Sequence, residues 1–292
     1  MTVDVLVVGG GIVGCAIASA CAKAGFGVTL LERGRLAGAA SSIDLALLGR
    51  PVPPEVEVQA QASADAYLEL HHFTGRSFFL DRSPVECDGG RGVLVRRIDV
   101  PGAALALVEE TRSYRAKLRA GRDVKDLVLR GGVVLGARTD EGELRAGTTV
   151  VAAGAETWRV CRSLPLHVPL TDVEGVCAVY PPGALELERP LLAEGAWAAP
   201  DRAGRTVAAE PERLPMRAGL VGRPPLERRV LRYARSTDGL PLLGPLPGVQ
   251  GLAVACGHGE LGVALAPAAG SAIAAGIATG TWNEALVPER LL

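Results

Sequence analysis

Lysine is scarce in this chain of 292 residues. Lys23, Lys117 and Lys125 are its lysines, and all other cations among the 31 Lys and Arg residues are arginine. Few side chains are therefore available as a catalytic amine. The 31 cations face 32 acids, giving a net charge of -1, and they form no basic block that could contact a phosphate backbone. We expect no nucleic-acid partner.

We also expect this sequence to have no signal peptide and no membrane span. Its apolar start carries Asp4, has no basic segment before it, and is broken by glycines 9–11. Residues 261–279 are apolar too, but they include Pro267 and many small residues, so we expect a buried helix there and no membrane span. These features predict a cytoplasmic protein.

Paired cysteines are absent as well. The six cysteines form no CxxC pair and have no metal-ligand spacing. We therefore expect free, mostly buried thiols in a reducing compartment, and no metal site.

A glycine-rich turn stands near the N-terminus, in the stretch VVGGGIVG. Residues 3–8 form an apolar run typical of a parallel strand covered on both faces. Gly9, Gly11 and Gly14 then satisfy G-x-G-x-x-G, and a helical pattern follows to residues 23–25. In such a turn the glycines allow a tight reversal, close approach of a pyrophosphate and close helix packing, and the helix N-terminus faces the phosphates.

An acidic residue follows at the expected place. The apolar residues 27–31 lead to Glu32, which lies 18 residues after Gly14 and can accept hydrogen bonds from a ribose diol. Strand, turn, helix, strand and acid together predict a dinucleotide site. This segment alone leaves NAD and FAD open. Ser41 and Ser42 come next, either close to the same phosphates or in a plain loop.

The middle of the chain alternates helical and strand patterns. Residues 51–54, PVPP, mark a crossing between layers. The patterns predict helices over 59–73 and from Asp99 and Pro101 to near Arg119, and strands over 77–80, 92–98, 124–129, 133–138 and 149–152.

The last third predicts a second sheet and a return to the first. Residues 165–227 are rich in Pro and in alternating apolar residues, which favours antiparallel strands, with a turn at 200–206. Residues 228–235 are expected to form a strand of the nucleotide-binding layer. The apolar strand 251–255 then enters a second glycine turn, ACGHGELG, and a long helix.

Four stretches in this order resemble the FAD-dependent D-amino acid oxidase superfamily, especially its glycine oxidase, sarcosine oxidase and amino-acid dehydrogenase branch: VVGGGIVG with Glu32, VVAAGAETW, STDGLPLLG and GHGELGVALAP. The resemblance covers the nucleotide-binding two thirds of the chain. It implies an α/β fold, α+β overall, in which a Rossmann-like FAD-binding domain carries an inserted, mainly antiparallel β substrate domain. The implied segments are 1–50, 96–160 and 228–292 for the FAD-binding domain, and 51–95 and 161–227 for the substrate domain.

The resemblance also implies roles for single residues. The first turn would hold the pyrophosphate, Glu32 would hold the adenosine ribose, and Val124 would meet the adenine through its backbone, while the second turn would approach the flavin. A helix N-terminus there can stabilise the negative charge of a reduced flavin. The implied cofactor-binding residues are Gly9, Gly11, Ile12, Val13, Gly14, Glu32, Arg33, Ser41, Ser42, Val124, Ala153, Gly154, Gly257, His258, Gly259, Glu260, Leu261 and Gly262.

Three positions depart from the pattern of these relatives. Tyr233 stands where members that oxidise amino acids place a carboxylate-binding Arg, and Glu260 stands where glycine oxidases place another. Leu231 replaces the Cys that attaches flavin in sarcosine oxidases, so we expect noncovalent FAD. Glu260 also suits a helix first turn, where an acid is worth roughly 0.3 to 1 kcal/mol.

The candidate catalytic residues are Tyr233, Arg235 and His258. Strand alternation puts the first two on one face of their strand and Arg232 on the other. His258 is either a residue beside the flavin or a turn residue satisfied by a carbonyl. The chain is also shorter than typical relatives, chiefly over residues 49–97.

The resemblance implies an amino-acid or amine oxidoreductase of EC type 1.4 or 1.5. An amino acid or secondary amine would pass a hydride from its CH–NH carbon to flavin N5, and the imine would hydrolyse. O2 or a quinone-type acceptor would reoxidise the flavin. A shortened lid would either leave the flavin more open or require a partner subunit or a second copy of the chain, in a homo-oligomer, to cover it. Two alternatives stay open: a flavin-binding subunit or degenerate relative without a substrate pocket, and a nicotinamide-dependent dehydrogenase.

Overall fold

The computed structural model describes all residues except 1, 81–84, 88–92, 185–189, 194 and 215–221. The helices of the described residues are α1 Ile12–Lys23, α2 Glu57–Thr74, α3 Val100–Ser113, α4 Thr157–Val160 and α5 Gly262–Thr279. The strands are β1 Thr2–Val8, β2 Val28–Glu32, β3 Leu45–Leu48, β4 Val85–Cys87, β5 Val93–Asp99, β6 Lys117–Ala120, β7 Val124–Arg130, β8 Val133–Thr139, β9 Gly142–Val151, β10 Leu170–Tyr180, β11 Leu191–Ala193, β12 Ala196–Pro200, β13 Thr206–Ala209, β14 Glu227–Ser236, β15 Leu242–Pro245 and β16 Leu252–Cys256.

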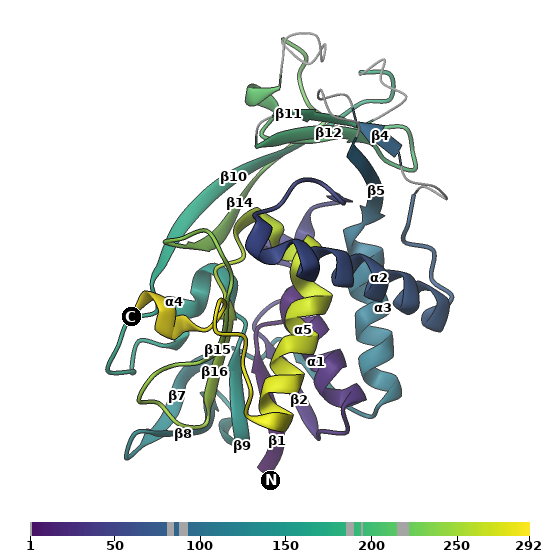
Figure 1. The fold of residues 1–292 in the computed structure, drawn as a ribbon. Helices are drawn as coiled ribbons and strands as arrows, with labels where there is room; N and C mark the ends of the chain where they lie inside the picture. The colour runs from purple at the N-terminus through teal and green to yellow at the C-terminus, as the bar shows by residue number, and fades with distance from the viewer. Residues whose placement is uncertain (1, 81–84, 88–92, 185–189, 194, 215–221) are drawn as a thin grey trace.

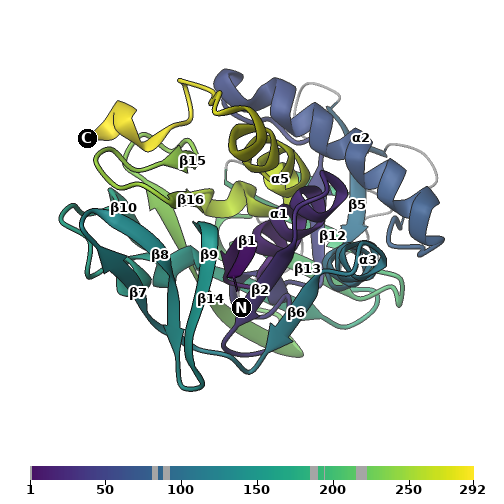
Figure 2. The same ribbon diagram turned by 90° about the horizontal axis from the view of Figure 1, so that it is seen from below.

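The largest sheet has eight strands and a parallel centre. Strands β16, β9, β1, β2 and β6 lie side by side and run parallel, and β15 pairs antiparallel at one edge. The hairpin β7–β8 branches from β9 and covers one face, while α1 and α5 cover the other (Figure 2). This is the three-layer arrangement expected of a nucleotide-binding α/β domain.

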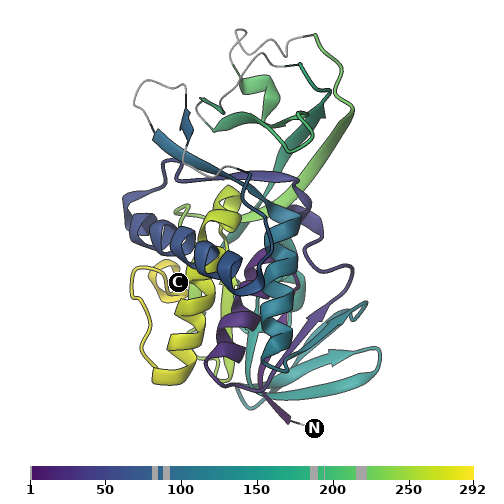
Figure 3. The ribbon, with the colours of Figure 1, turned by 90° about the vertical axis from the view of Figure 1, so that its right-hand side faces the viewer.

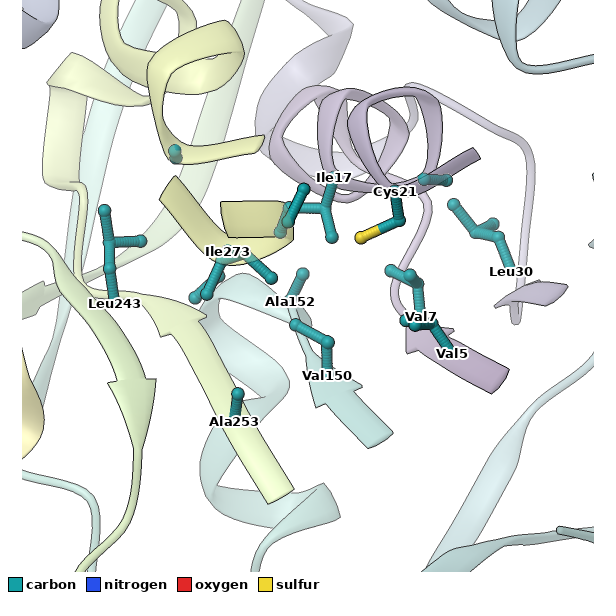
Figure 4. Packing of buried hydrophobic residues seen from close by; sticks show 14 of the residues in the cluster. Val5, Val7, Ile17, Cys21, Leu30, Val150, Ala152, Leu243, Ala253 and Ile273 are labelled. Carbon is teal, nitrogen blue, oxygen red and sulfur yellow. The ribbon is translucent and has the colours of Figure 1, made fainter. Parts of the chain in front are cut away.

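The core lies between this sheet and the two helices. Val5 and Val7 of β1 meet Ile17 and Cys21 of α1, and Ile273 of α5 closes the same cluster (Figure 4). Small residues let α5 approach α1 closely: a Cβ at Gly270 would overlap the carbonyl oxygen of Ala16. Helix α2 crosses over α1, α3 and α5 (Figure 3), where Tyr67 is fully buried.

Two smaller sheets lie above the carboxyl ends of the parallel strands (Figure 1). One has five antiparallel strands in the order β11-β12-β13-β10-β14, and the other has three in the order β3-β5-β4. They share an apolar cluster in which Leu45 and Val95 meet Trp197 and Val207. The antiparallel sheets therefore form a roof over the nucleotide-binding edge, as the fold class predicted.

Most expected elements are present, including the turn between β12 and β13, but three segments differ. The helix expected to reach Arg119 ends at Ser113, because Arg115 adopts a left-handed φ of 61° that turns the chain into β6. Residues 77–80 make one isolated bridge, from Phe79 to Ile98, and no strand.

The strand expected in the nucleotide-binding layer over 228–235 belongs to the five-stranded sheet instead. All of β14 from Glu227 to Ser236 pairs antiparallel with β10. Its end returns to the nucleotide-binding layer through an isolated bridge between Arg235 and His258. Strand β14 is therefore the wall that connects the roof to the second glycine turn. The domain boundaries drawn from the sequence remain a prediction.

One helix of the described residues, Gly259–Thr279, is long and apolar enough to cross a membrane by length and composition. In the fold, 56% of its most apolar window is buried against the rest of the chain. Five cysteines are free and buried: Cys15, Cys21, Cys161, Cys177 and Cys256. The side chain of Cys87 lies outside the described residues.

Candidate active site

A cavity of about 880 Å³ opens at the carboxyl ends of the parallel strands. It extends from the end of β2 and the start of β7, past both glycine turns, to β10, β14 and η4 (Pro211–Arg213) of the roof. Ligands of open α/β sheets bind at this edge. The volume lies in the upper part of the range for small-molecule and cofactor sites.

The first glycine turn forms the middle of the cavity. Gly9 has a left-handed φ of 110°, and a Cβ at Gly14 would overlap the Gly9 carbonyl oxygen. The backbone N–H of Ile12, at the start of α1, donates to Ser41 Oγ over 3.0 Å. Ser41 and Ser42 belong to η1 (Ala39–Ser42), and both line the cavity. The hydroxyl and the helix N-terminus therefore face the same point, which suits an anion.

Glu32 is fixed by two backbone donors. Gly10 N–H donates to Oε2 and Gly34 N–H donates to Oε1, each over 2.7 Å. A carboxylate oxygen can accept more than one hydrogen bond, so both oxygens keep capacity for a diol. The carboxylate is thus oriented before any ligand arrives.

The far end of the cavity beyond Glu32 is organised by Arg159. Its guanidinium donates to the Val124 carbonyl, to Asp123 Oδ1 and to Glu156 Oε2, each over 3.0 Å. Glu156 also pairs with Arg33 over 3.1 Å. The Arg159 guanidinium therefore connects the start of β7 to η3 (Gly154–Glu156) and, through the Glu156 pair with Arg33, to the end of β2.

The second glycine turn buries an unpartnered histidine. Gly257 and Gly259 have φ values of 73° and 53°, and His258 between them is 7% exposed. His258 Nε2 has no hydrogen-bond partner among the described residues. A carbonyl that satisfies this nitrogen, one of the two alternatives from the sequence, is therefore not found there. Burial lowers the pKa of His258 to about 4, so the ring is neutral at pH 7.

This burial predicts a pH dependence of stability. An unfolded histidine titrates near 6.5, and the folded one titrates near 4. Stability is therefore full above pH 6.5 and falls as the pH drops toward 4, by about 3 kcal/mol. Urea unfolding of the apoprotein should show this loss in wild type and not in His258→Gln. The exposed His167→Gln is the matched control, and an unchanged pH slope in His258→Gln would contradict the assignment.

The wall opposite the second turn carries charge and one aromatic ring. Arg235 Nη2 lies 2.6 Å from Glu260 Oε2, and each side chain is 44% exposed. Tyr233 stands two residues earlier on β14 and packs over Gly175, where a Cβ would meet its ring at 2.8 Å. Burial, and then the nearby Glu260 carboxylate, raises the pKa of Tyr233. The phenol therefore stays protonated.

Arg50 joins this group from a distant segment and was not predicted from the sequence. Its Nη2 donates to the backbone oxygen of Glu260 over 3.0 Å. Burial lowers the Arg50 pKa, while Glu260 and Tyr233 oppose the shift. In the sequence Arg50 stands alone between Gly49 and the PVPP segment, and no motif around it indicates a binding role. Only the fold brings it to the cavity.

The structure places nearly all predicted site residues around this cavity. Tyr233, Arg235 and His258 line it, as do the predicted cofactor-binding residues except Gly14 and Leu261. Gly14 lies under the first turn, and Leu261 is 8% exposed in the core beneath the second turn. Their roles in binding remain predictions.

These residues fit a flavin dinucleotide. The oriented carboxylate of Glu32 suits a ribose, and the glycine turn and Ser41 suit a pyrophosphate. The buried Nε2 of His258, which has no partner among the described residues, lies in the second turn, which lines the same cavity and suits a ring system. The glycines of the second turn let such a ring approach the backbone.

Comparison with known proteins agrees with this site. The family model described as FAD dependent oxidoreductase, DAO, matches residues 4–85 and 56–275. The chain belongs to this family of FAD-dependent oxidoreductases. In sequence it is similar to glycine oxidases, and its fold is similar to that of solved glycine oxidases.

The similarities extend over almost the whole chain. A glycine oxidase of Pseudomonas aeruginosa is 27% identical over 340 aligned positions, which include 92% of this chain and 93% of that protein. L-proline dehydrogenase from P. horikoshii has a TM-score of 0.84 at 17% identity, with 99% and 98% of the two chains covered. Glycine oxidase from Bacillus cereus has a TM-score of 0.80 at 18% identity, with 98% and 97% covered.

Proposed function

We propose that this protein is an FAD-dependent oxidoreductase that oxidises the CH–NH bond of a small amino acid or secondary amine. The observation that carries the proposal is the meeting of Arg50, Tyr233 and Glu260 at the end of the cavity formed by the second glycine turn. At this end of the cavity Arg50 supplies a cation and Tyr233 an aromatic ring, and the nearby His258 supplies a neutral, buried imidazole. Together they suit an amino-acid substrate.

The two ends of the cavity have different roles in this proposal. Glu32 and the backbone around Val124 hold the adenosine, and the first turn with Ser41 holds the pyrophosphate. The second turn, residues 257–262, lies along the flavin. Leu231 offers no thiol for attachment, so the FAD is noncovalent. Membership in an FAD-dependent family supports flavin over the nicotinamide alternative.

The substrate would be positioned by the roof. The Arg50 guanidinium holds the substrate carboxylate, and the Tyr233 ring covers the substrate from β14. The bound flavin supplies a hydride acceptor. The chain itself orients the neutral amine and excludes water, so no catalytic base is required. The imine that forms is hydrolysed in water.

The relatives' names support this substrate class, since they include glycine oxidases and an L-proline dehydrogenase. We further propose an EC type 1.4 or 1.5 reaction, O2 or a quinone-type compound as acceptor, a cytoplasmic location, and a second copy or partner subunit beside the shortened region. The 340-position alignment with a chain of 292 residues supports such a shortening.

An anaerobic screen tests the proposal. Purified protein should be yellow, release its flavin on denaturation, and be bleached by one of glycine, sarcosine, D-amino acids, L-proline or hydroxyproline. A flavin that stays with the denatured chain would contradict noncovalent binding. A yellow protein that none of these compounds bleaches would favour the flavin-binding subunit instead.

A further inference from the structure

The ion pair between Arg235 and Glu260 occupies the part of the cavity where the substrate is proposed to lie. Arg235 Nη2 and Glu260 Oε2 are 2.6 Å apart. The backbone bridge from Arg235 to His258 holds the two segments in register, and a Cβ at Gly259 would meet Arg235 Nε at 3.3 Å. The pair is therefore built into the second glycine turn, and it leaves Arg235 neutralised.

Arg50 differs from Arg235 because no carboxylate of the described residues forms an ion pair with it, although the Glu260 charge acts on it at longer range. Its one hydrogen bond among the described residues goes to the Glu260 backbone oxygen, through Nη2. The remaining donors of its guanidinium are available to a ligand. The side chain is partly buried, and burial lowers its pKa. A partly desolvated cation of this kind attracts an anion more strongly than a fully solvated one does.

The other charges on this wall are engaged or exposed. Glu210 Oε1 accepts from the Val176 N–H over 2.8 Å, and Arg213 is exposed, where solvent screens its charge. The remaining arginines of β14 are bound in pairs: Arg228 with Glu212, Arg229 with Glu227 and Asp44, and Arg232 with Asp172.

The charges of the cluster then select the ligand. Arg50 and Arg235 together carry two positive charges and Glu260 carries one negative charge, which leaves one positive charge for one carboxylate. A second carboxylate on the ligand would meet the Glu260 carboxylate, and like charges at close range are repulsive. Removing the Glu260 charge would free Arg235 for that second carboxylate.

We propose that Glu260 determines the charge class of the substrate: it neutralises Arg235, so that the site accepts one carboxylate at Arg50 and rejects dicarboxylic amino acids. This inference rests on the proposed function, because it takes the Arg50 end of the cavity as the substrate site. It assigns Glu260 a role in specificity that exceeds a favourable interaction with the helix dipole.

Two probes of equal shape test this inference without turnover. Succinate and succinamate differ by one carboxylate replaced with a neutral amide. Their dissociation constants are measured on the oxidised holoenzyme from the change in the flavin absorption band, with calorimetry as a second measurement. Wild type should bind succinamate at least roughly 10-fold more tightly than succinate, and Glu260→Gln should gain roughly 30-fold for succinate with little change for succinamate.

Two further variants separate the pair from a general charge effect. Glu260→Gln combined with Arg235→Gln should lose the gain, because no guanidinium is left for the second carboxylate. Glu174→Gln removes a negative charge from β10 in the same cavity without freeing an arginine, so it should give no gain. A gain that survives in the double variant, or one that Glu174→Gln reproduces, would overturn the role of Glu260.

The outcomes also distinguish this inference from the proposed function. A switch of preference in Glu260→Gln together with a flavin that no amine bleaches would support the carboxylate site and reject the oxidoreductase. Bleaching of the flavin by an amino acid, together with equal binding of succinate and succinamate by wild type, would support the oxidoreductase and reject the role of Glu260 in selecting the charge of the substrate. Binding of neither probe to wild type and Glu260→Gln would reject the site at Arg50.

Discussion

Gly14→Ala is expected to weaken FAD binding strongly and to destabilise the fold. The added Cβ would overlap the Gly9 carbonyl oxygen, which is a backbone atom and cannot move aside as the end of a flexible side chain could. Gly9 is itself held at a φ of 110° against the backbone of Ala152. Helix α1 must therefore shift away from β1, which costs about 3 kcal/mol by overpacking.

The same shift moves the helix N-terminus away from the phosphate position. We expect the dissociation constant for FAD to rise at least roughly 100-fold, as a loss of about 3 kcal/mol implies. Flavin fluorescence quenching on titration of apoprotein measures this constant, and urea unfolding measures stability. Gly34→Ala is the control, because its Cβ would meet Glu32 Oε1 at an ordinary 3.5 Å. Equal FAD affinity in Gly14→Ala and wild type would refute the role of this turn.

The first turn could be predicted because its determinants are local. The strand, the glycines at fixed spacing, the helix and Glu32 all lie within 32 residues, and each has a steric or hydrogen-bonding reason that can be read from neighbours. In the structure, the hydrogen bonds from the backbone N–H groups of Gly10 and Gly34 to the Glu32 carboxylate are an example of such a local contact. The second turn could be placed for the same reason.

The parts that could not be predicted depend on distant partners. Strand β14 has a pattern that fits either sheet, and its place is decided by pairing with β10, which lies about sixty residues earlier. The end of α3 depends on Leu118, which reaches the apolar core beside β2 when β6 pairs there. Propensity along the chain carries no information on such pairing.

Arg50 is the clearest example of a residue whose place depends on a distant part of the chain. It meets Glu260 across 210 residues of sequence, and neither residue has a local pattern that names the other. The sequence showed only that Tyr233 and Glu260 stand where these relatives place arginines. The fold brings another cation, Arg50, to this end of the cavity from the segment after β3.

Arg50→Met is therefore expected to weaken substrate binding while leaving FAD bound. Methionine keeps much of the apolar length of the side chain and removes the guanidinium, so the substrate carboxylate would be left without its charged donor in a partly desolvated site. We expect the dissociation constant of a monocarboxylate such as succinamate to rise roughly 100-fold. Arg50→Lys should recover part of this loss, since it restores the charge without the planar fork.

The control for this substitution lies on the neighbouring wall. Arg232→Met also removes a guanidinium, but Arg232 is bound to Asp172 on β10 over 2.8 Å and is 57% exposed. It should change succinamate binding less than roughly 3-fold, as expected for a surface pair. FAD affinity and the unfolding midpoint should stay near wild type in Arg50→Met, because the one hydrogen bond of Arg50 among the described residues goes to a single carbonyl. If Arg50→Met and Arg232→Met weakened binding equally, the anchor would have to lie elsewhere in the cavity, and the exposed Arg213 would be the next residue to replace.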